Sequence, residues 1–341
     1  MTIRLSANES SFGPSPAAIE AYHAAAAGLN RYPDANQTAL REAIAQVHGL
    51  DAARIVCGNG SDELIQLVIR ASANAGDEVL LSENGFVMCE IHARAHGTTV
   101  VKAPERDDRV DVDALIARIT PRTRVLCLAN PNNPTGTWLG DAEIRRLHAA
   151  LPVHVMLLLD GAYAEYVDAP DYEPGARLVE SASNVVMTRT FSKIHGLPAL
   201  RIGWAYCPSA LREAIHRIRS PFNVSAPAMA AATAAVRDVA WVDRIRARNK
   251  SELARIGAVL GELALEMVPS VTNFYLLRFP AESDMDGNGA AALLIANDIL
   301  PRPVAPSPRV QELRITVGTG EENDAVLEVL RRYVQGERAV G

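Results

Sequence analysis

A lysine near the middle of the chain is the residue best suited to covalent chemistry. Lys193 follows a predicted strand, stands beside the hydroxyl residues Thr190 and Ser192, and is followed across a loop by Arg201. Burial disfavours a charged ammonium, so a buried lysine can act as a nucleophilic amine and form a Schiff base. The hydroxyls and the planar guanidinium are donors that suit a phosphate dianion. A loop ion pair is an equally good explanation of this segment alone.

Three other polar segments also follow apolar strands. Asp160 ends an apolar strand, and a buried carboxylate needs a cation or a protonated ring nitrogen, unless it only caps the next turn. The glycine-rich residues 58–62 join a strand to a helix, where free backbone N–H groups suit phosphate, although such turns are common. Residues 130–136 form a stiff loop of asparagines and prolines. Together these segments favour an anion-binding site of which Lys193 is part.

The elements that must position these groups alternate between strands and helices. Apolar runs predict strands at 54–57, 78–81, 98–102, 125–129, 155–159 and 185–189. Helical patterns fall at 62–73, 88–95, 112–119, 141–150 and 176–181. Buried strands separated by helical crossovers predict a mainly parallel sheet covered on both faces, with ligands at the carboxyl ends of its strands.

The chain changes character after residue 226. It becomes helical over 226–235 and 241–265, then shows alternating strands at 274–278 and 313–317 and a last helix at 323–334. We therefore expect two domains. The large one spans 31–230, and the small α+β domain combines the arm 1–30 with 231–341.

Composition excludes several classes of protein. The 341 residues are 48% hydrophobic and 22% charged, as in ordinary globular proteins, and the net charge of −6 opposes bulk binding of nucleic acid. The cysteines are widely spaced and offer no metal-ligand pattern, so we expect reduced core thiols and no metal. We see no secretory signal and no apolar run of ~20 residues. We expect a cytoplasmic protein with neither nucleic-acid nor membrane partners.

The polar motifs described above follow one another along the chain in the same order as in a known family of enzymes. Residues 133–136, Asp160 with Tyr163, Lys193 and Arg201 resemble the fold-type I aminotransferases, which use pyridoxal 5′-phosphate, over nearly the whole chain. The resemblance is greatest to the histidinol-phosphate aminotransferase branch, through segments 8–9, 13–16, 31–34, 58–63 and 313–318. It implies a large domain with a mainly parallel, seven-stranded sheet covered by helices, and a smaller α+β domain.

The resemblance also implies roles for single residues. Lys193 would bond covalently to the cofactor and move the proton between substrate Cα and C4′. Asp160 would pair with the pyridine nitrogen, and Tyr163 and Asn133 would hydrogen-bond the phenolic O3′. Phe86 would stack on the pyridine, or else be an ordinary core residue.

The cofactor phosphate and the substrate need donors of their own. The implied phosphate donors are the backbone of Ser61 and Asp62, the hydroxyls of Thr190 and Ser192, and Arg201. Tyr32 would reach the neighbouring subunit's phosphate site, which implies a homodimer with shared active sites, or would pack in its own subunit. Arg314 would grip the substrate anion and Arg302 would be a second anion-binding residue, with a surface arginine as the alternative.

The predicted reaction is transamination between L-histidinol phosphate and 2-oxoglutarate in histidine biosynthesis, with glutamate as the biosynthetic amino donor. Ser10-Ser11 replaces an Asn-Pro frequent in relatives, and Cys89 replaces a frequent tyrosine, so substrate preference stays open. The alternatives are an aromatic (Phe or Tyr) aminotransferase and a pyridoxal-dependent decarboxylase of the threonine-phosphate type. An aminotransferase-like effector domain of a transcription regulator is disfavoured, because the residues before Arg31 are too few for a DNA-binding domain.

Overall fold

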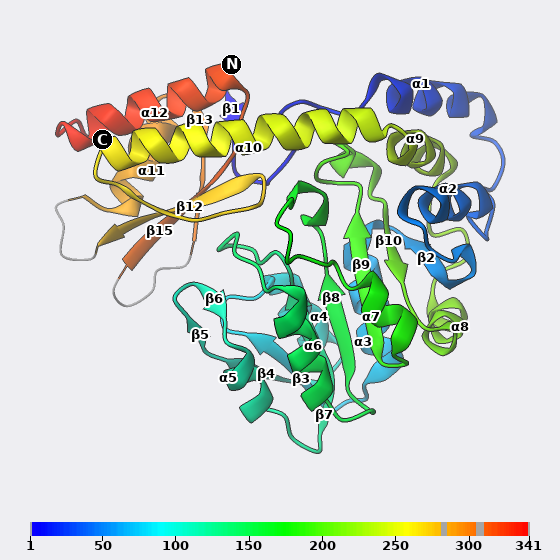
Figure 1. The fold of residues 1–341 in the computed structure, drawn as a ribbon. Coiled ribbons are helices and arrows are strands. Elements are labelled where there is room, and N and C mark those ends of the chain that lie inside the picture. Colours follow the sequence, from blue (N-terminus) through cyan, green and yellow to red (C-terminus); the bar gives the residue numbers. More distant parts are fainter. Residues whose placement is uncertain (1, 281–284, 305–309, 340–341) are drawn as a thin grey trace.

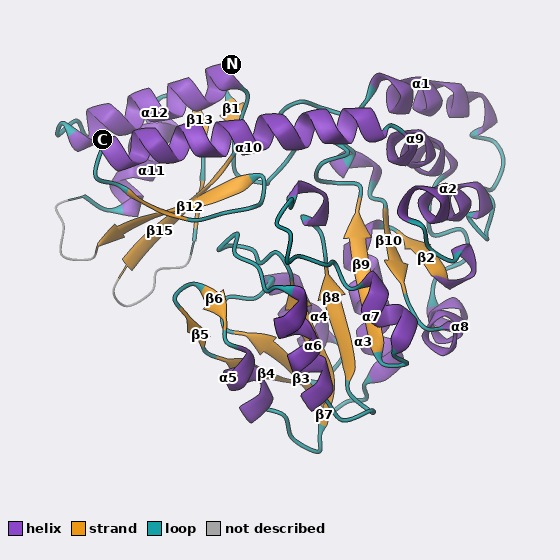
Figure 2. Cartoon of the chain, viewed as in Figure 1, coloured by secondary structure: helices purple, strands orange, loops and turns teal. Residues whose placement is uncertain are grey.

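The computed structural model describes residues 2–280, 285–304 and 310–339 (Figure 1). Within these ranges the chain forms a larger lobe around a seven-stranded sheet and a smaller lobe around a four-stranded sheet. The long helix α10 (Val239–Glu262) runs from the larger lobe to the smaller one (Figure 2). No helix in the described ranges is long and apolar enough to cross a membrane.

The seven-stranded sheet is mainly parallel. In spatial order its strands are β2 (Ile55–Gly58), β10 (Gly203–Tyr206), β9 (Val185–Thr190), β8 (Met156–Asp160), β7 (Thr123–Ala129), β3 (Glu78–Ser82) and β4 (Thr99–Ala103). Only β10 is antiparallel to both of its neighbours, and the other pairings are parallel. The six expected strands are present. Strand β10 was not predicted, because four residues that begin with a glycine give almost no alternation.

Helices cover both faces of this sheet, as the fully apolar strands require. On one face lie α1 (Pro16–Ala25), α2 (Thr38–His48), α5 (Val112–Ala117), α6 (Asp141–Ala150), α7 (Ala176–Ser181) and α9 (Ala226–Arg237). On the other lie α3 (Gly60–Ser72), α4 (Val87–Ala95) and α8 (Ser209–Ile218). Successive strand residues alternate between the two cores: Leu157 and Leu159 pack in the first and Leu158 in the second. The four cysteines are buried and free.

The smaller lobe is an antiparallel sheet backed by helices. Its strands, in order, are β11 (Glu266–Val268), β12 (Phe274–Pro280), β15 (Val310–Thr316) and β14 (Arg302–Pro303). Its other helices are α11 (Gly287–Ala296) and α12 (Gly320–Val334), and α12 starts with a capping box between Thr319 and Glu322. Strand β1 (Ile3–Arg4) pairs with β13 (Ile299–Leu300), which places the N-terminal segment against this lobe.

An arginine on the small lobe joins the two lobes. Arg278, on β12, forms ion pairs with Glu266 and Glu312 on its own sheet. It also pairs with Asp108, in the turn of the hairpin β5 (Glu105–Arg106) and β6 (Arg109–Val110) of the larger lobe. A backbone hydrogen bond of 3.1 Å from Val271 N to Gly136 O adds a second link. These contacts hold the small lobe close to the carboxyl ends of the central strands.

Candidate active site

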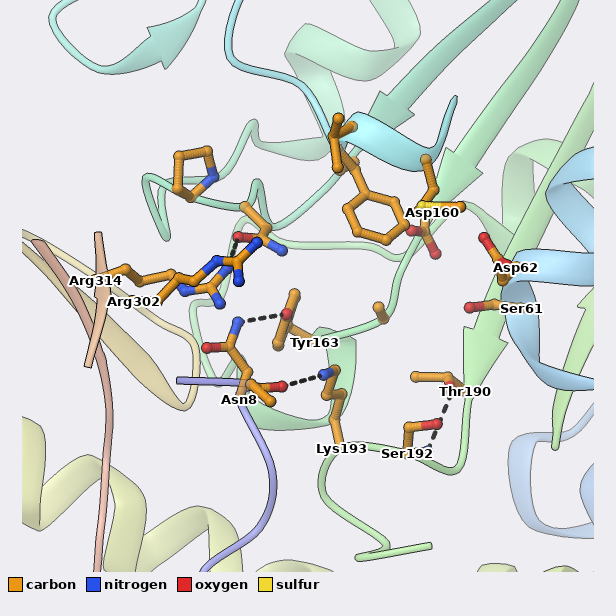
Figure 3. A pocket seen from close by; sticks show the side chains of 18 of the residues that line it. Asn8, Ser61, Asp62, Asp160, Tyr163, Thr190, Ser192, Lys193, Arg302 and Arg314 are labelled. Carbon is orange, nitrogen blue, oxygen red and sulfur yellow. Dashed lines mark hydrogen bonds between the residues drawn. The ribbon is translucent and has the colours of Figure 1, made fainter. Parts of the chain in front are cut away.

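A cavity of about 810 Å³ lies between the carboxyl ends of the central strands and the small lobe (Figure 3). Strands β7, β8 and β9 supply its floor, and β14 and β15 reach it from the small lobe. It is lined by every predicted site residue except Tyr32, namely Ser61, Asp62, Phe86, Asn133, Asp160, Tyr163, Thr190, Ser192, Lys193, Arg201, Arg302 and Arg314. The structure thus brings the separate sequence motifs to one place.

Lys193 lies in the loop directly after β9 and points into the cavity (Figure 3). Its Nζ donates to the carbonyl of Ala7 at 3.1 Å and lies 5.7 Å from the ring centre of Tyr163. Desolvation, and then the positive charge of Arg314, lower the pKa of Lys193 to about 8. A useful fraction of the amine is therefore neutral, and hence nucleophilic, near neutral pH.

Asp160 is a buried carboxylate that forms no ion pair with any residue that the structure describes. It is the last residue of β8, is 3% exposed, and accepts a hydrogen bond from Thr188 Oγ1 at 2.9 Å. Among the described residues no lysine, arginine or histidine pairs with it. Burial raises its pKa to about 6. A protonated pyridine nitrogen would supply the missing charge, so this site fits the expected cofactor.

Backbone and side-chain donors form a cradle for an anion. Ser61 and Asp62 occupy the first turn of α3, and Arg201 Nη1 donates to Ser192 Oγ at 3.4 Å. Gly60 has a φ of +85°, and a Cβ there would lie 2.8 Å from Arg201 Nη2. A side chain in place of either this glycine or Gly203 would push the cradle apart, because a Cβ on Gly203 would lie 2.4 Å from Ser61 N.

Two predicted O3′ ligands accept hydrogen bonds from other parts of the chain. Tyr163 Oη accepts from Asn8 Nδ2 at 2.8 Å, and burial raises the pKa of Tyr163 to about 12. Asn133 Oδ1 accepts from Arg314 Nη1 at 2.6 Å. Each of these two side chains is therefore held by a residue from a distant part of the chain. Phe86, at the start of α4, is half-buried and lines the same cavity.

Two arginines reach the cavity from neighbouring strands. Arg302 on β14 is the register partner of Arg314 on β15. Arg314 Nη2 also donates to the carbonyl of Ser6 at 2.7 Å, and burial lowers the pKa of Arg314. Within the described ranges neither guanidinium pairs with a carboxylate. Two uncompensated cations side by side suit an anionic substrate.

Tyr32 lies outside this cavity. It is 84% exposed, and its ring stacks on Phe222 with the ring centres 4.7 Å apart. Both rings line a second hollow, which is also lined by Arg201 and so lies next to the anion cradle. The tyrosine is thus poorly buried by its own subunit.

The structure adds contacts that the sequence analysis did not assign. Asn8 belonged to a family motif but was given no role, and Thr188 was not considered although it binds Asp160. His195, two residues after Lys193, lies against Phe191 with Nε2 4.0 Å from Glu165 Oε1, and is absent from the cavity lining. Strand alternation could have indicated Thr188, because it lies on β9 next to Asp160 in register.

A lysine after a central strand, a buried carboxylate and a cradle of anion donors in one cavity fit an enzyme that uses pyridoxal phosphate. The chain belongs to the aminotransferase class I and II family, whose model matches residues 1–330. This membership confirms the expected class of enzyme, its fold and its cofactor.

Two similar proteins and one similar crystal structure all bear the name histidinol-phosphate aminotransferase. A histidinol-phosphate aminotransferase of Granulibacter bethesdensis is 49% identical over 97% of this chain and 89% of that protein. One of Paramagnetospirillum magneticum is 48% identical over 97% and 92%. The crystal structure of histidinol-phosphate aminotransferase from Sinorhizobium meliloti in complex with pyridoxal 5′-phosphate has a TM-score of 0.90 at 31% identity, covering 98% of this chain and 91% of that one.

Proposed function

We propose that this aminotransferase transfers an amino group between L-histidinol phosphate and 2-oxoglutarate, with glutamate as the donor in the biosynthetic direction. The observation that carries the proposal is the pair of uncompensated arginines, Arg302 and Arg314, in the cavity that contains Lys193. A phosphate ester carries more negative charge than one carboxylate and can engage both guanidiniums. The names of the relatives at 48–49% identity support the same substrate.

Each predicted residue has a place in this reaction. Bound pyridoxal phosphate supplies an electron sink that stabilises negative charge at substrate Cα. We assign Asp160 to the ring nitrogen, where a carboxylate keeps the proton in place, and Tyr163 and Asn133 to the phenolic oxygen. Lys193 would move the proton between substrate Cα and C4′ of the cofactor, and its lowered pKa suits an amine that must both accept and release a proton.

The phosphate of the cofactor has its own donors. We assign it to the N-terminus of α3, where Ser61 and Asp62 carry free N–H groups, together with Thr190, Ser192 and Arg201. We assign Phe86 to the face of the ring. These donors would hold the phosphate end of the cofactor in the cavity that Lys193 also lines.

We also propose that the active protein is a cytoplasmic homodimer with shared sites. Tyr32 is exposed, stacks on the partly exposed Phe222, and lies beside the hollow that Arg201 lines. Burial of these two rings by a second subunit would remove apolar surface from water and bring Tyr32 to that subunit's phosphate donors. The division into a large domain, 31–230, and a small one formed by 1–30 and 231–341 is part of this proposal.

A steady-state comparison tests the substrate. Histidinol phosphate and phenylalanine are each supplied with 2-oxoglutarate, and glutamate and carbon dioxide are measured. The proposal predicts higher kcat/KM for histidinol phosphate, strict dependence on 2-oxoglutarate, and no carbon dioxide. Preference for phenylalanine would favour the aromatic alternative, and release of carbon dioxide without 2-oxoglutarate would favour a decarboxylase.

A chemical test examines the cofactor site. The protein is loaded with pyridoxal phosphate, reduced with borohydride and digested, and the peptides are analysed by mass spectrometry. The reduced pyridoxyl group should be attached to Lys193. Attachment at another lysine, or at none, would contradict the assignment.

A further inference from the structure

The N-terminal segment 6–9 lines the cavity, with Asn8 close to Tyr163 (Figure 3). The carbonyl of Ser6 accepts from Arg314 at 2.7 Å, and that of Ala7 accepts from Lys193 at 3.1 Å. Asn8 comes next and places its side chain against Tyr163. This segment thus contacts three of the proposed functional groups, although no role has been assigned to any of its side chains.

Asn8 is fixed by the small lobe on its backbone side. Its φ of +54° is left-handed, a conformation that asparagine tolerates better than most residues. Its N–H donates to Thr316 Oγ1 at 3.0 Å, and its carbonyl accepts from Asn273 Nδ2 at 3.0 Å. Asn8 and Thr316 are each 1% exposed, so water does not compete for these hydrogen bonds.

The same network determines which way round the Asn8 amide lies. The hydroxyl of Thr316 accepts from the Asn8 backbone, and its own hydrogen is then donated to Asn8 Oδ1 at 3.3 Å. The amide oxygen must therefore face Thr316, and Nδ2 faces Tyr163 Oη at 2.8 Å. This orientation follows from the donors and acceptors rather than from the shape of the side chain.

The orientation of Asn8 in turn directs the hydrogen of Tyr163. The tyrosine oxygen already accepts a hydrogen bond from Asn8, so its own hydrogen points elsewhere. Among the described residues no acceptor receives that hydrogen, and Tyr163 lines the cavity. The hydroxyl is left as a donor that faces the space where the proposed function places the cofactor.

We propose that Asn8 is a positioning residue, which holds the hydroxyl of Tyr163 as a hydrogen-bond donor to the phenolic oxygen of the cofactor. The inference rests on the proposed function, since it concerns the same cofactor. Asn133 shows the same polarity, because Arg314 donates to its Oδ1 and leaves its amide hydrogens for the cavity. Both O3′ ligands are thus set as donors, one by the N-terminal segment and one by the small lobe.

The test uses two variants of Asn8 that keep its backbone conformation. Glycine and aspartate both tolerate a positive φ. Asn8→Gly removes the donor, and Asn8→Asp retains the shape but presents an acceptor, toward which the Tyr163 hydroxyl would turn. Tyr163→Phe provides the reference without any hydroxyl.

The main readout is the pH midpoint at which the visible absorbance of the pyridoxal-phosphate-loaded protein changes. A donor on the phenolic oxygen draws off negative charge and so lowers the proton affinity of the neighbouring cofactor group. Asn8→Asp should raise the midpoint by about one pH unit, a tenfold change in proton affinity, toward the value for Tyr163→Phe. Asn8→Gly should raise it by less.

A double-mutant cycle shows whether Asn8 acts through Tyr163. In the Tyr163→Phe background, Asn8→Gly should leave the midpoint unchanged. A purely structural role would lower the unfolding temperature of Asn8→Gly without moving the midpoint, and that result would overturn the inference. An equal shift with and without the tyrosine hydroxyl would also overturn it. Failure of the proposed function is a separate outcome, seen in the steady-state comparison with phenylalanine. Failure of the cofactor assignment would leave wild-type protein without a pH-dependent absorbance change on loading.

Discussion

The two sides of the cavity hold their polar groups in different ways. On the sheet side, Asp160 and Thr190 are buried at strand ends, and the anion cradle depends on glycines that leave no room for a Cβ. On the small-lobe side, Arg302 is exposed, and Arg314 is held by Ser6 and Asn133 from other parts of the chain. The sheet side suits one cofactor that stays in place. The small-lobe side suits substrates that exchange, because its contacts can be replaced by those of a ligand.

The largest effect is expected from replacing Lys193, on the sheet side of the cavity. Lys193→Ala should abolish the absorbance band of the lysine-bound cofactor and lower kcat by about 10³-fold or more, because both the covalent attachment and the proton transfer are lost. Absorbance spectra and single-turnover kinetics measure the two effects. Lys193→Arg, which retains a cation but no nucleophilic amine, serves as the matched control and should be equally inactive. Retained transamination in either variant would contradict the role of Lys193.

The pH dependence of stability should reveal that Asp160, on the sheet side, has no cationic partner until the cofactor binds. A carboxyl pKa raised from 3.8 to about 6 means that the folded protein binds more protons than the unfolded one in this window. The Asp160 contribution to the stability of the cofactor-free protein therefore falls as pH rises through the window. Cofactor-free Asp160→Asn should be more stable than wild type at pH 7, by about 2–3 kcal/mol, and equally stable near pH 3.

Urea unfolding at several pH values measures this difference in stability. The same variant, loaded with cofactor, should have a lower kcat, because an amide cannot hold the proton on the ring nitrogen. Thr188→Val, which removes only the hydrogen bond to Asp160, is the control for packing. A loss of stability in cofactor-free Asp160→Asn at pH 7 would mean that a cation of the protein stabilises the Asp160 carboxylate.

On the small-lobe side, substitutions of the two arginines should differ in which substrates they affect. Arg314→Ala should raise KM for both glutamate and histidinol phosphate by about 10²-fold, because a partly buried guanidinium makes strong charge-assisted hydrogen bonds. Arg302→Ala should affect only the phosphate substrate, by about fivefold, as expected for an exposed ion pair. Steady-state kinetics with each substrate separates the two arginines. Equal effects of Arg302→Ala on glutamate and histidinol phosphate would remove the distinction.

The smallest effect is expected at Tyr32, which lines neither side of the cavity in its own subunit. If it donates to the phosphate site of a second subunit, Tyr32→Phe should weaken cofactor binding by about tenfold, the value of one hydrogen bond to a charged group. Titration of the cofactor-free protein measures the dissociation constant, and Phe222→Leu tests the stacking separately. An unchanged constant in Tyr32→Phe would support a packing role.

The strands and the positions of Asp160 and Lys193 at strand ends could be predicted from sequence because their signals are local, whereas most other site residues were named from the resemblance to a family. Asp160 and Lys193 follow apolar runs, and a polar residue after such a run falls at the edge of a parallel sheet. Strand β10 could not be predicted in this way, because its place between β2 and β9 depends on pairing and not on its own pattern. The boundary of α12 was three residues late because its start depends on a capping box at Thr319.

Contacts between residues far apart in the sequence could not be predicted from local sequence patterns. Asn8 and Tyr163 are 155 positions apart, and Arg314 and Asn133 are 181 apart, so each hydrogen bond exists only when both lobes are folded. The missing cation of Asp160 is likewise a property of its assembled surroundings. The residue types could therefore be predicted, but the direction of their hydrogen bonds required the structure.

The ion pairs of Arg278 have a consequence for incoming substrate. Arg278 is already paired with Glu266, Glu312 and Asp108, whereas among the described residues no carboxylate pairs with Arg302 on β14 or Arg314 on β15. The same small sheet therefore carries one cation whose charge is balanced and two whose charges are available to a ligand. An anion that diffuses toward this lobe is attracted to these two guanidiniums rather than to Arg278, so the electrostatic potential guides it to the cavity that Lys193 lines.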